Sequence, residues 1–361
     1  MANIDDVAKK ANVSKMTVSR VLNEPDKVKD TTRENVLAVI KELKYRPNMM
    51  AKGLVTKRSH TIAHVIASIS NPYHPKVVQG VEDACYENGY NVILCNANAK
   101  KKEEEYIEIL MDKSVDGIIF HHLNITLRQA WDLEEAGIKC VYIDNEKPLL
   151  NVTNMLIDQV NGAYMATKHL IELGHKNIGT IHGGLAYSDK VIKQVYEHNF
   201  QFSIWNHRLE GYLKAMSDYG LDVVQKYMIE GDGGANRGFI SGKIAMENLI
   251  GGKEGLENFL NSKDRPTAIY AQNDQMAIGA INGAMECGCR VPEDISIIGQ
   301  DGLDIGETLF PQLTTIEQPR YEIGYKAAKK IIDMLDNDDG NSTLSIDSKL
   351  IIRQSTSELK Q

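Results

Sequence analysis

Polar and aromatic side chains stand at the ends of several apolar segments of this chain, where they could bind a ligand. These side chains are Tyr73, His74, His121, Asp144, Asn273, Asp274 and Asp301. Asp and Asn oxygens accept hydrogen bonds from hydroxyl groups, and an aromatic ring can stack on the face of a sugar. The set is therefore typical of a polyol-binding site. Each lone histidine also has a structural interpretation, as does Asp274 in the role of a helix N-cap.

Motifs for enzymatic chemistry are weak in comparison. The glycines at 231–238 (GDGGANRG) lack the G-x-G-x-x-G spacing, and the sequence has neither a phosphate-binding loop nor a GxSxG motif. His64, His74, His121, His122 and His182 are scattered along the chain, and Cys287-x-Cys289 alone does not make a zinc site. We therefore expect no catalytic residue, no metal and no cofactor. A sugar-active enzyme and a free sugar-binding protein of the cytosol are the alternatives.

The candidate ligand-binding residues need a scaffold that brings them together. Short apolar strands alternate with amphipathic helices after residue 59, which is the pattern of parallel α/β sheets. The expected strands are 62–69, 91–95, 117–120, 140–143, 178–182, 268–271 and 295–298, and the expected helices include 75–88, 159–173, 275–286 and 320–335. This length exceeds what one such sheet uses, so we expect two lobes. Ligands of open parallel sheets bind at the carboxyl ends of the strands.

Charge is distributed unevenly along the chain. Residues 1–58 hold 13 of the 41 Lys and Arg but only 7 of the 49 Asp and Glu, a net charge of +6. The remaining 28 basic and 42 acidic residues give the rest of the chain a net charge of −14. A basic head on an acidic body is expected when only the head meets a polyanion. With no membrane-spanning stretch, no secretory signal and five sparse cysteines, we expect a cytoplasmic protein.

The basic head has the pattern of a helix-turn-helix. Helical spacing of apolar residues predicts a first helix over 4–11 and a second over 15–22, the second capped by Ser14. A capping box, Thr31-x-x-Glu34, predicts the start of a third helix. In this motif the second helix enters the major groove, where Arg or Lys can contact guanine. The DNA-reading side chains would be Lys15, Met16, Thr17, Ser19, Arg20 and Asn23. A three-helix bundle without a role on DNA is the alternative.

Strings along nearly the whole chain carry a family resemblance. They include IDDVAKKANVSKMTVSRVLN at 4–23, TTRENVLAVIKELKYRPN at 31–48, AKGL at 51–54, LIELGHKNIGTIHGG at 170–184, PTAIYAQNDQMAIGAINGAMECGCRVPEDISIIGQD at 266–301 and LTTIEQP at 313–319. On these strings the chain resembles the LacI/GalR family of bacterial transcriptional repressors. The resemblance implies a small all-α helix-turn-helix head plus an α/β two-lobed core like that of periplasmic binding proteins, with parallel sheets flanked by helices.

The resemblance also implies a division of the chain into domains. It gives a helix-turn-helix domain at 1–46, a hinge helix or linker at 47–58 and an effector-binding and dimerisation core at 59–361, with one lobe at about 59–160 plus 292–319 and the other at about 161–291 plus 320–361. In the family the hinge orders on the operator and inserts a leucine into the minor groove, and Leu54 is the matching residue. A plain linker is the alternative for this segment.

The function that the resemblance implies is repression under the control of a small molecule. A homodimer would bind a pseudo-palindromic, double-stranded operator, and an effector between the lobes would change its affinity. The effector contacts carried over from the family are Tyr73, His74, His121, Asp144, Arg208, Asn273 and Asp301. A sugar or oligosaccharide is the expected effector, and a non-sugar metabolite or a phosphoprotein corepressor is the alternative. The usual response of sugar-binding members is release from DNA.

Three features depart from the family's pattern. Gly233 and Gly234 stand where some sugar-binding members place an aromatic residue. The connection at 186–207 is longer than usual and rich in aromatic residues, Trp205 among them. We interpret this connection as a lid or an extra aromatic wall for a larger effector, with a helix packed on the lobe or in the dimer as the alternative. The family's leucine-heptad tail is not found, so we expect a dimer rather than a tetramer.

Overall fold

The computed structural model describes residues 2–45, 58–97, 100–112, 115–121, 126–144, 152–183, 204–232, 237–337 and 340–360. The chain divides into two compact units, Met1–His60 and Thr61–Gln361. The predicted hinge at 47–58, including Leu54, lies outside the described residues except for its last residue. Gly233 and Gly234 also lie outside them, as does the long connection up to residue 203.

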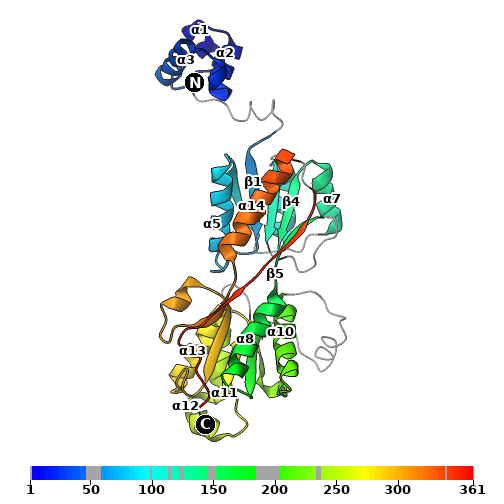
Figure 1. The fold of residues 1–361 in the computed structure, drawn as a ribbon, viewed down its shortest axis with the longest axis vertical. Coiled ribbons are helices and arrows are strands. Elements are labelled where there is room, and N and C mark those ends of the chain that lie inside the picture. Colours follow the sequence, from blue (N-terminus) through cyan, green and yellow to red (C-terminus); the bar gives the residue numbers. More distant parts are fainter. Residues whose placement is uncertain are drawn as a thin grey trace. The chain divides into compact units, whose positions relative to one another are not determined.

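The first unit is a three-helix head (Figure 1). Its helices are α1 (Ile4–Ala11), α2 (Lys15–Asn23) and α3 (Asp30–Glu42), with a short 3-10 turn, η1 (Pro25–Lys27), after α2. They enclose a small core of Val7, Ala8, Ala11, Val18, Val21, Val36 and Val39. Asn3 forms a capping box with Asp6 at the start of α1, and Asn12 ends that helix in a left-handed conformation. The predicted helix-turn-helix is confirmed.

The start of the third helix differs from the prediction. Helix α3 begins at Asp30, and its N-cap residue, Lys29, makes no capping hydrogen bond through its side chain. The Thr31-x-x-Glu34 capping box is therefore wrong, because Thr31 already lies in the first turn. Asp30 pairs with Arg33 at 2.8 Å one turn later, and its carboxylate is favourably placed at the positive end of the helix dipole.

The first lobe of the second unit contains a six-stranded parallel sheet in the order β11-β5-β4-β3-β1-β2. Its strands are β1 (Thr61–Ile66), β2 (Asn91–Asn96), β3 (Gly117–His121), β4 (Lys139–Ile143), β5 (Thr153–Ile157) and β11 (Thr343–Ile346). Helices α5 (His74–Glu87) and α14 (Arg320–Asn337) cover one face, and α6 (Lys100–Asp112) and α7 (Leu127–Glu135) cover the other. A Cβ on Gly80 would lie 2.1 Å from the Tyr321 carbonyl oxygen, so glycine permits the close approach of α5 and α14.

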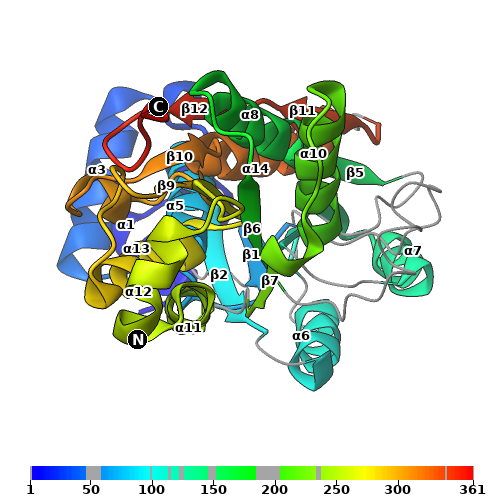
Figure 2. The same cartoon turned by 90° about the horizontal axis from the view of Figure 1, so that it is seen from below.

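The second lobe contains another six-stranded sheet, in the order β12-β10-β9-β8-β6-β7. Its strands are β6 (Ile178–Gly183), β7 (Met228–Gly231), β8 (Ala268–Ala271), β9 (Ser296–Asp301), β10 (Thr314–Glu317) and β12 (Lys349–Ile351), of which only β12 runs antiparallel to its neighbour. Helices α11 (Gly238–Ile250), α12 (Gly252–Asn261) and α13 (Asp274–Cys287) lie on one side, and α8 (Gln159–Glu172) and α10 (Ile204–Asp218) lie on the other (Figure 2). Two short 3-10 turns, η2 (Gln225–Tyr227) and η3 (Asp304–Glu307), connect these elements.

The chain passes between the two sheets in the described residues at three points: between β5 and α8, between β10 and α14, and between β11 and β12. The predicted lobe boundaries are therefore wrong in the C-terminal third. Residues 292–319 belong to the second lobe, because β9 and β10 pair next to β8. Residues 320–346 belong to the first, because the apolar side of α14 packs into the core under β1, β3 and β4.

Candidate DNA-reading helix and effector site

Helix α2 presents the side chains that were predicted to read DNA. Ser14 fixes its start, since the Ser14 hydroxyl accepts a hydrogen bond of 3.0 Å from the backbone N–H of Thr17. The Met16 side chain is 66% exposed, and Arg20 is exposed as well. An exposed arginine on the outer side of such a helix can form a bidentate contact with guanine. The predicted N-cap and the predicted exposed side of α2 are therefore confirmed.

Other predicted DNA contacts make hydrogen bonds or ion pairs within the head. Lys15 Nζ lies 2.5 Å from Asp5 Oδ1, and both side chains are exposed. Such a surface pair contributes little and can be exchanged for a phosphate or a base. Asn23 Nδ2 donates to the Ser19 carbonyl oxygen at 2.9 Å and to the Ser19 Oγ at 3.3 Å, which holds the last turn of α2 together. The role of these side chains on DNA remains a prediction.

The first lobe places three of the predicted effector contacts in one aromatic group. Tyr73 precedes α5, His74 begins it, and His121 ends β3. The His74 and His121 rings meet edge to face with centroids 4.6 Å apart, and their Nδ1 atoms are 3.3 Å apart. The Tyr73 ring lies 5.7 Å from His74 and 5.8 Å from His121. All three are nearly fully buried.

A fourth ring, His64, belongs to the same group and was not predicted to do so. His64 lies on β1, and its ring is stacked with His121 at a centroid distance of 6.0 Å. It is fully buried, and neither ring nitrogen makes a hydrogen bond with a residue that the structure describes. Burial lowers the pKa of His64 from 6.5 to about 3, so the ring is neutral at physiological pH. We call Tyr73, His74, His121 and His64 the first-lobe cluster.

Asp144 follows β4 and adopts a left-handed backbone conformation with φ of 45°. This conformation is uncommon for a residue other than glycine, and Asp is among those that tolerate it. Its Oδ1 accepts a hydrogen bond of 2.8 Å from the backbone N–H of Ile157, and its own N–H donates to the Met155 carbonyl oxygen at 2.9 Å. Asp144 is therefore held firmly at the carboxyl edge of the first sheet.

The second lobe holds Arg208 and Asp301 in a buried ion pair. Arg208 projects from α10, and its guanidinium donates to Asp301 Oδ1 at 2.9 Å at the end of β9. It also donates to Gln159 Oε1 at 2.9 Å and to the Gln272 carbonyl oxygen. The Arg208 side chain is 3% exposed and that of Asp301 is 11% exposed. The guanidinium geometry is thus fixed by three separate acceptors.

The N-cap of α13 is Asn273 and not Asp274, the residue that the sequence offered for this role. Asn273 is the N-cap of α13, since its side chain accepts a hydrogen bond of 2.7 Å from the Met276 N–H. Asp274 lies inside the helix, fully buried, and accepts hydrogen bonds from the Leu303 N–H at 2.6 Å and the Thr315 hydroxyl at 2.5 Å. Burial, followed by the nearby Asp301 charge, raises the pKa of Asp274 to about 7. Asp274 therefore has a structural role.

Tyr73 connects the two groups of residues electrostatically. Burial raises the pKa of the Tyr73 phenol well above its ordinary value. The negative charges of Asp144 and Asp301 add to this rise, whereas the positive charges of Arg208 and Arg320 oppose it. The Tyr73 phenol therefore lies within electrostatic range of Asp144 from the first lobe and of Arg208 and Asp301 from the second.

Three buried glutamines complete the second-lobe side of this site and were missed in the sequence. Gln159 begins α8, Gln300 lies in β9 and Gln318 follows β10. Gln300 Nε2 donates to Gln159 Oε1 at 3.0 Å, and Gln318 Nε2 donates to Asp301 Oδ1 at 3.2 Å. We call Arg208, Asp301, Gln159, Gln300 and Gln318 the second-lobe network. A glutamine within or directly after an apolar strand, as in SIIGQD and TTIEQP, is the signal that could have indicated them.

Trp205 is the one aromatic residue of the long connection that the structure describes. It lies in the first turn of α10, half-buried against the core of the second lobe, with the Arg208 guanidinium 5.6 Å from its ring centroid. A Cβ on Gly183 would lie only 2.5 Å from the Trp205 ring, so this glycine makes room for the indole. Trp205 thus lies next to a predicted effector contact, and its role as part of a lid remains a prediction.

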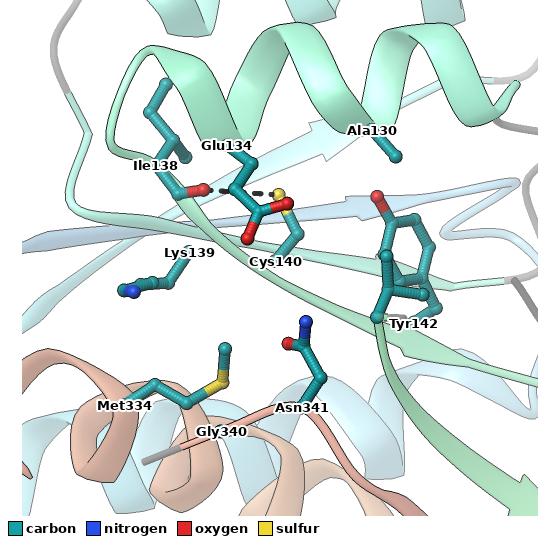
Figure 3. Close-up of a pocket in the computed structure, with 10 residues that line it drawn as sticks. Ala130, Glu134, Ile138, Lys139, Cys140, Tyr142, Met334, Gly340 and Asn341 are labelled. Carbon is teal, nitrogen blue, oxygen red and sulfur yellow. Dashed lines mark hydrogen bonds between the residues drawn. The ribbon is translucent and has the colours of Figure 1, made fainter. Parts of the chain in front are cut away.

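A separate pocket lies at the amino end of β4, away from these residues (Figure 3). It encloses about 240 Å³ and is lined by Glu134, Lys139, Cys140, Tyr142 and Asn341 among others. The predicted effector contacts of the first lobe lie at the opposite edge of its sheet, where the strands have their carboxyl ends. This pocket is therefore not the predicted effector site. Within the described ranges, no three His, Cys, Asp or Glu side chains are grouped to hold a metal ion, and no helix is long and apolar enough to cross a membrane.

Comparison with known proteins places these features in a family. Residues 3–48 match the model of bacterial regulatory proteins of the lacI family, and residues 167–356 match that of a periplasmic binding protein-like domain. The HTH-type transcriptional repressor PurR of Proteus mirabilis is 34% identical over 367 residues, which cover 99% of this chain and 98% of that protein.

Solved structures agree with this relationship. A lac repressor dimer bound to operator and the anti-inducer ONPF matches with a TM-score of 0.79 and 25% identity over 99% of each chain. A complex of the transcriptional regulator CelR with cellobiose matches with a TM-score of 0.66 and 28% identity, covering 98% of this chain and 100% of that one. A helix-turn-helix head joined to a two-lobed binding core defines a class of ligand-controlled DNA-binding regulators. Within this class, the chain belongs to the LacI family of bacterial regulatory proteins.

Proposed function

We propose that this chain is a homodimeric transcriptional repressor whose operator affinity is set by a carbohydrate bound between its two lobes. The observation that carries the effector class is the pairing of a polar network with an aromatic cluster. Arg208 and Asp301 offer fixed donors and acceptors for hydroxyl groups, and Tyr73, His74 and His121 offer rings for the apolar face of a sugar. A related regulator, CelR, is known in complex with cellobiose.

The proposed effector contacts are the seven residues chosen from the sequence. They are Tyr73, His74, His121, Asp144, Arg208, Asn273 and Asp301. Asn273 uses its carbonyl oxygen as an N-cap, so its amide N–H group would serve the effector. Arg208 and Asp301 are already oriented by neighbouring hydrogen bonds, which lowers the entropic cost of binding. No residue is assigned a catalytic role, in agreement with a family of regulators.

The proposed DNA-binding surface is the exposed side of α2 together with Leu54. Two copies of α2 in a dimer would read the two halves of a pseudo-palindrome, and the paired hinge segments would kink its centre. The lac repressor was solved as a dimer on its operator. As a regulator of transcription, the protein would act in the cytoplasm, on the nucleoid when bound to DNA.

One experiment tests the two halves of this proposal separately. An operator selected from random duplexes by the purified protein is titrated in the presence of glucose, ribose, cellobiose, longer oligosaccharides, sugar phosphates and nucleobases. A carbohydrate that changes operator affinity tenfold or more, and that raises the melting temperature, supports the carbohydrate site. A change with a nucleobase alone would replace the sugar by a different metabolite. No change with any compound would favour a protein corepressor.

Arg20 provides the test of base recognition. The Arg20→Ala variant is expected to lose about 1–3 kcal/mol of operator binding and to relax specificity at one base pair in each half-site. The measurement is binding to a set of operators that differ at single positions, at fixed salt. Lys41→Ala, a charge removal on α3, serves as the control for general electrostatics. Equal weakening on every sequence would make Arg20 a phosphate contact instead.

Trp205 tests the role assigned to the long connection. If the connection forms an aromatic wall, Trp205→Ala weakens the binding of a disaccharide more than that of a monosaccharide. Unchanged effector affinity would contradict the wall and favour a purely structural connection. Thermal melting of the variant separates a loss of packing from a loss of binding, because Trp205 also packs on the lobe core.

A further inference from the structure

Two of the three passages between the lobes are joined by a pair of glutamine side chains. Gln159 lies where the chain leaves β5 for α8, and Gln318 lies where it leaves β10 for α14. Gln318 Nε2 donates to Gln159 Oε1 at 3.3 Å, and Gln159 Nε2 approaches Gln318 Oε1 at 3.5 Å. The residues are 5% and 2% exposed, respectively. Buried amides of this kind are effective links because each one both donates and accepts.

The same two amides are bonded to the residues proposed to bind the effector. Gln159 Oε1 accepts a hydrogen bond of 2.9 Å from Arg208 Nε, and Gln318 Nε2 donates to Asp301 Oδ1 at 3.2 Å. Arg208 and Asp301 close the circuit through their ion pair of 2.9 Å. Four side chains therefore form one closed ring, two of them on passages between the lobes and two of them at the effector site.

The third passage differs. Between β11 and β12 the buried polar side chain is Ser348, whose hydroxyl makes no hydrogen bond with a residue that the structure describes. The closed ring of side chains thus joins two of the passages. The third passage takes no part in the ring and serves as the control region in the experiment below. A link that joins moving segments can transmit the state of a site only if its bonds differ between the two states.

We propose that Gln159 and Gln318 are positioning residues that couple the effector site to the two passages through this closed ring. An effector that accepts a hydrogen bond from Arg208 or donates one to Asp301 competes directly with the two glutamines. Gln159 Oε1 accepts from Arg208, and Asp301 Oδ1 accepts from both Arg208 and Gln318. Occupancy then loosens or redirects both passages together. This coupling rests on the proposed effector site, whereas the link between the passages does not.

Hydrogen exchange of the intact protein without any effector tests the link. Gln318→Leu is expected to speed exchange about five- to tenfold at the start of α8, in residues 159–163, although the substitution lies on the other passage. Gln159→Leu is expected to do the same at 318–323. The double variant should exchange no faster than either single variant, because each one already opens the ring. Gln354→Leu, an exposed glutamine of the second lobe, is the matched control.

The outcomes are distinct. Faster exchange at the passage that was not substituted, with the passage at 347–348 unchanged, supports the ring. If each substitution affects only its own passage, the two glutamines act locally and the proposal is wrong. A uniform rise over the whole second lobe would mean general destabilisation and would also overturn it. Because no effector is present, a failure of the carbohydrate assignment cannot alter these results.

Discussion

The two halves of the proposed effector site are built in different ways. The second-lobe network is a closed set of hydrogen bonds around a buried ion pair, and Arg208 and Asp301 each have a hydrogen-bond partner besides one another. The first-lobe cluster is made of rings in contact, and His64 makes no hydrogen bond with any described residue. The second-lobe network is ordered by directional hydrogen bonds, and the first-lobe cluster is ordered by the shape and packing of aromatic rings.

This difference assigns different tasks to the two lobes. Hydrogen bonds with fixed geometry select the pattern of hydroxyl groups on a ligand, because a missing partner leaves a buried polar atom unsatisfied. Ring contacts are more tolerant and mainly provide apolar area. We therefore expect the second lobe to decide which sugar binds and the first lobe to contribute affinity for many sugars. The following changes test this contrast.

The largest effect is expected from Arg208→Ala. The substitution leaves Asp301 and Gln159 buried without the guanidinium, and removal of one partner from a buried pair costs about 3–5 kcal/mol. Urea denaturation measures the loss of unfolding free energy. Asp301→Asn, which keeps an acceptor for Arg208, should lose less. A loss below about 1 kcal/mol in Arg208→Ala would show that the network is not a rigid unit.

An intermediate effect is expected from His64→Leu, and it depends on pH. The pKa of His64 is about 3 in the folded protein, below its value of 6.5 in the unfolded chain. The unfolded state therefore binds the extra proton, and stability is lost as the pH falls from about 6.5 towards 3. Leucine cannot take up this proton. Between pH 7 and pH 5 the variant should lose about 2 kcal/mol less stability than the wild type.

Denaturation curves at the two pH values provide this measurement. At pH 7 the variant should be at least as stable as the wild type, because two buried nitrogens without hydrogen bonds are removed. If the wild type and the His64→Leu variant lost the same stability between pH 7 and pH 5, His64 could not be a neutral histidine whose pKa is lowered by burial. That result would also weaken the description of the first-lobe cluster as an assembly held by ring packing.

The smallest effect is expected outside both halves of the site. Arg237 and Asp232 form a pair of 3.5 Å on the surface of the second lobe, with side chains that are 78% and 44% exposed. Solvent screens such a pair, so Arg237→Ala should cost less than about 1 kcal/mol. The variant is measured beside Arg208→Ala under the same conditions. Similar losses in the two variants would remove the distinction between buried and surface pairs.

The sequence predicted best those features that depend on a short stretch of neighbouring residues. The cap at Ser14, the exposed side of α2 and the alternation of strands and helices all follow from local patterns. The expected strand at 62–69 is shorter in the structure, where β1 ends at Ile66. Strands β5, β7, β10 and β11 were not predicted, because each has only four or five residues.

The parts that sequence reasoning missed depend on contacts between distant segments. The lobe boundaries failed because α14 joins the first lobe through packing against α5, some 240 positions earlier in the chain. The three glutamines of the second-lobe network were missed because an isolated glutamine carries no periodic pattern. His64 was seen only as a scattered histidine, since its proximity to His121 arises from the pairing of β1 with β3.

The return of α14 and β11 to the first lobe has a consequence for synthesis on the ribosome. Strands β1 to β5 and helix α5 are translated first, yet α14, which covers the same face of the sheet together with α5, begins about 160 residues after β5, after every strand of the second lobe except β12. At rates of up to about 20 residues per second, roughly eight seconds or more pass before α14 completes the cover of this face. A nascent chain that stops before α14 therefore lacks the helix that packs on Val77, Ile119 and Val141, and transiently exposed apolar surface of this kind is prone to aggregation.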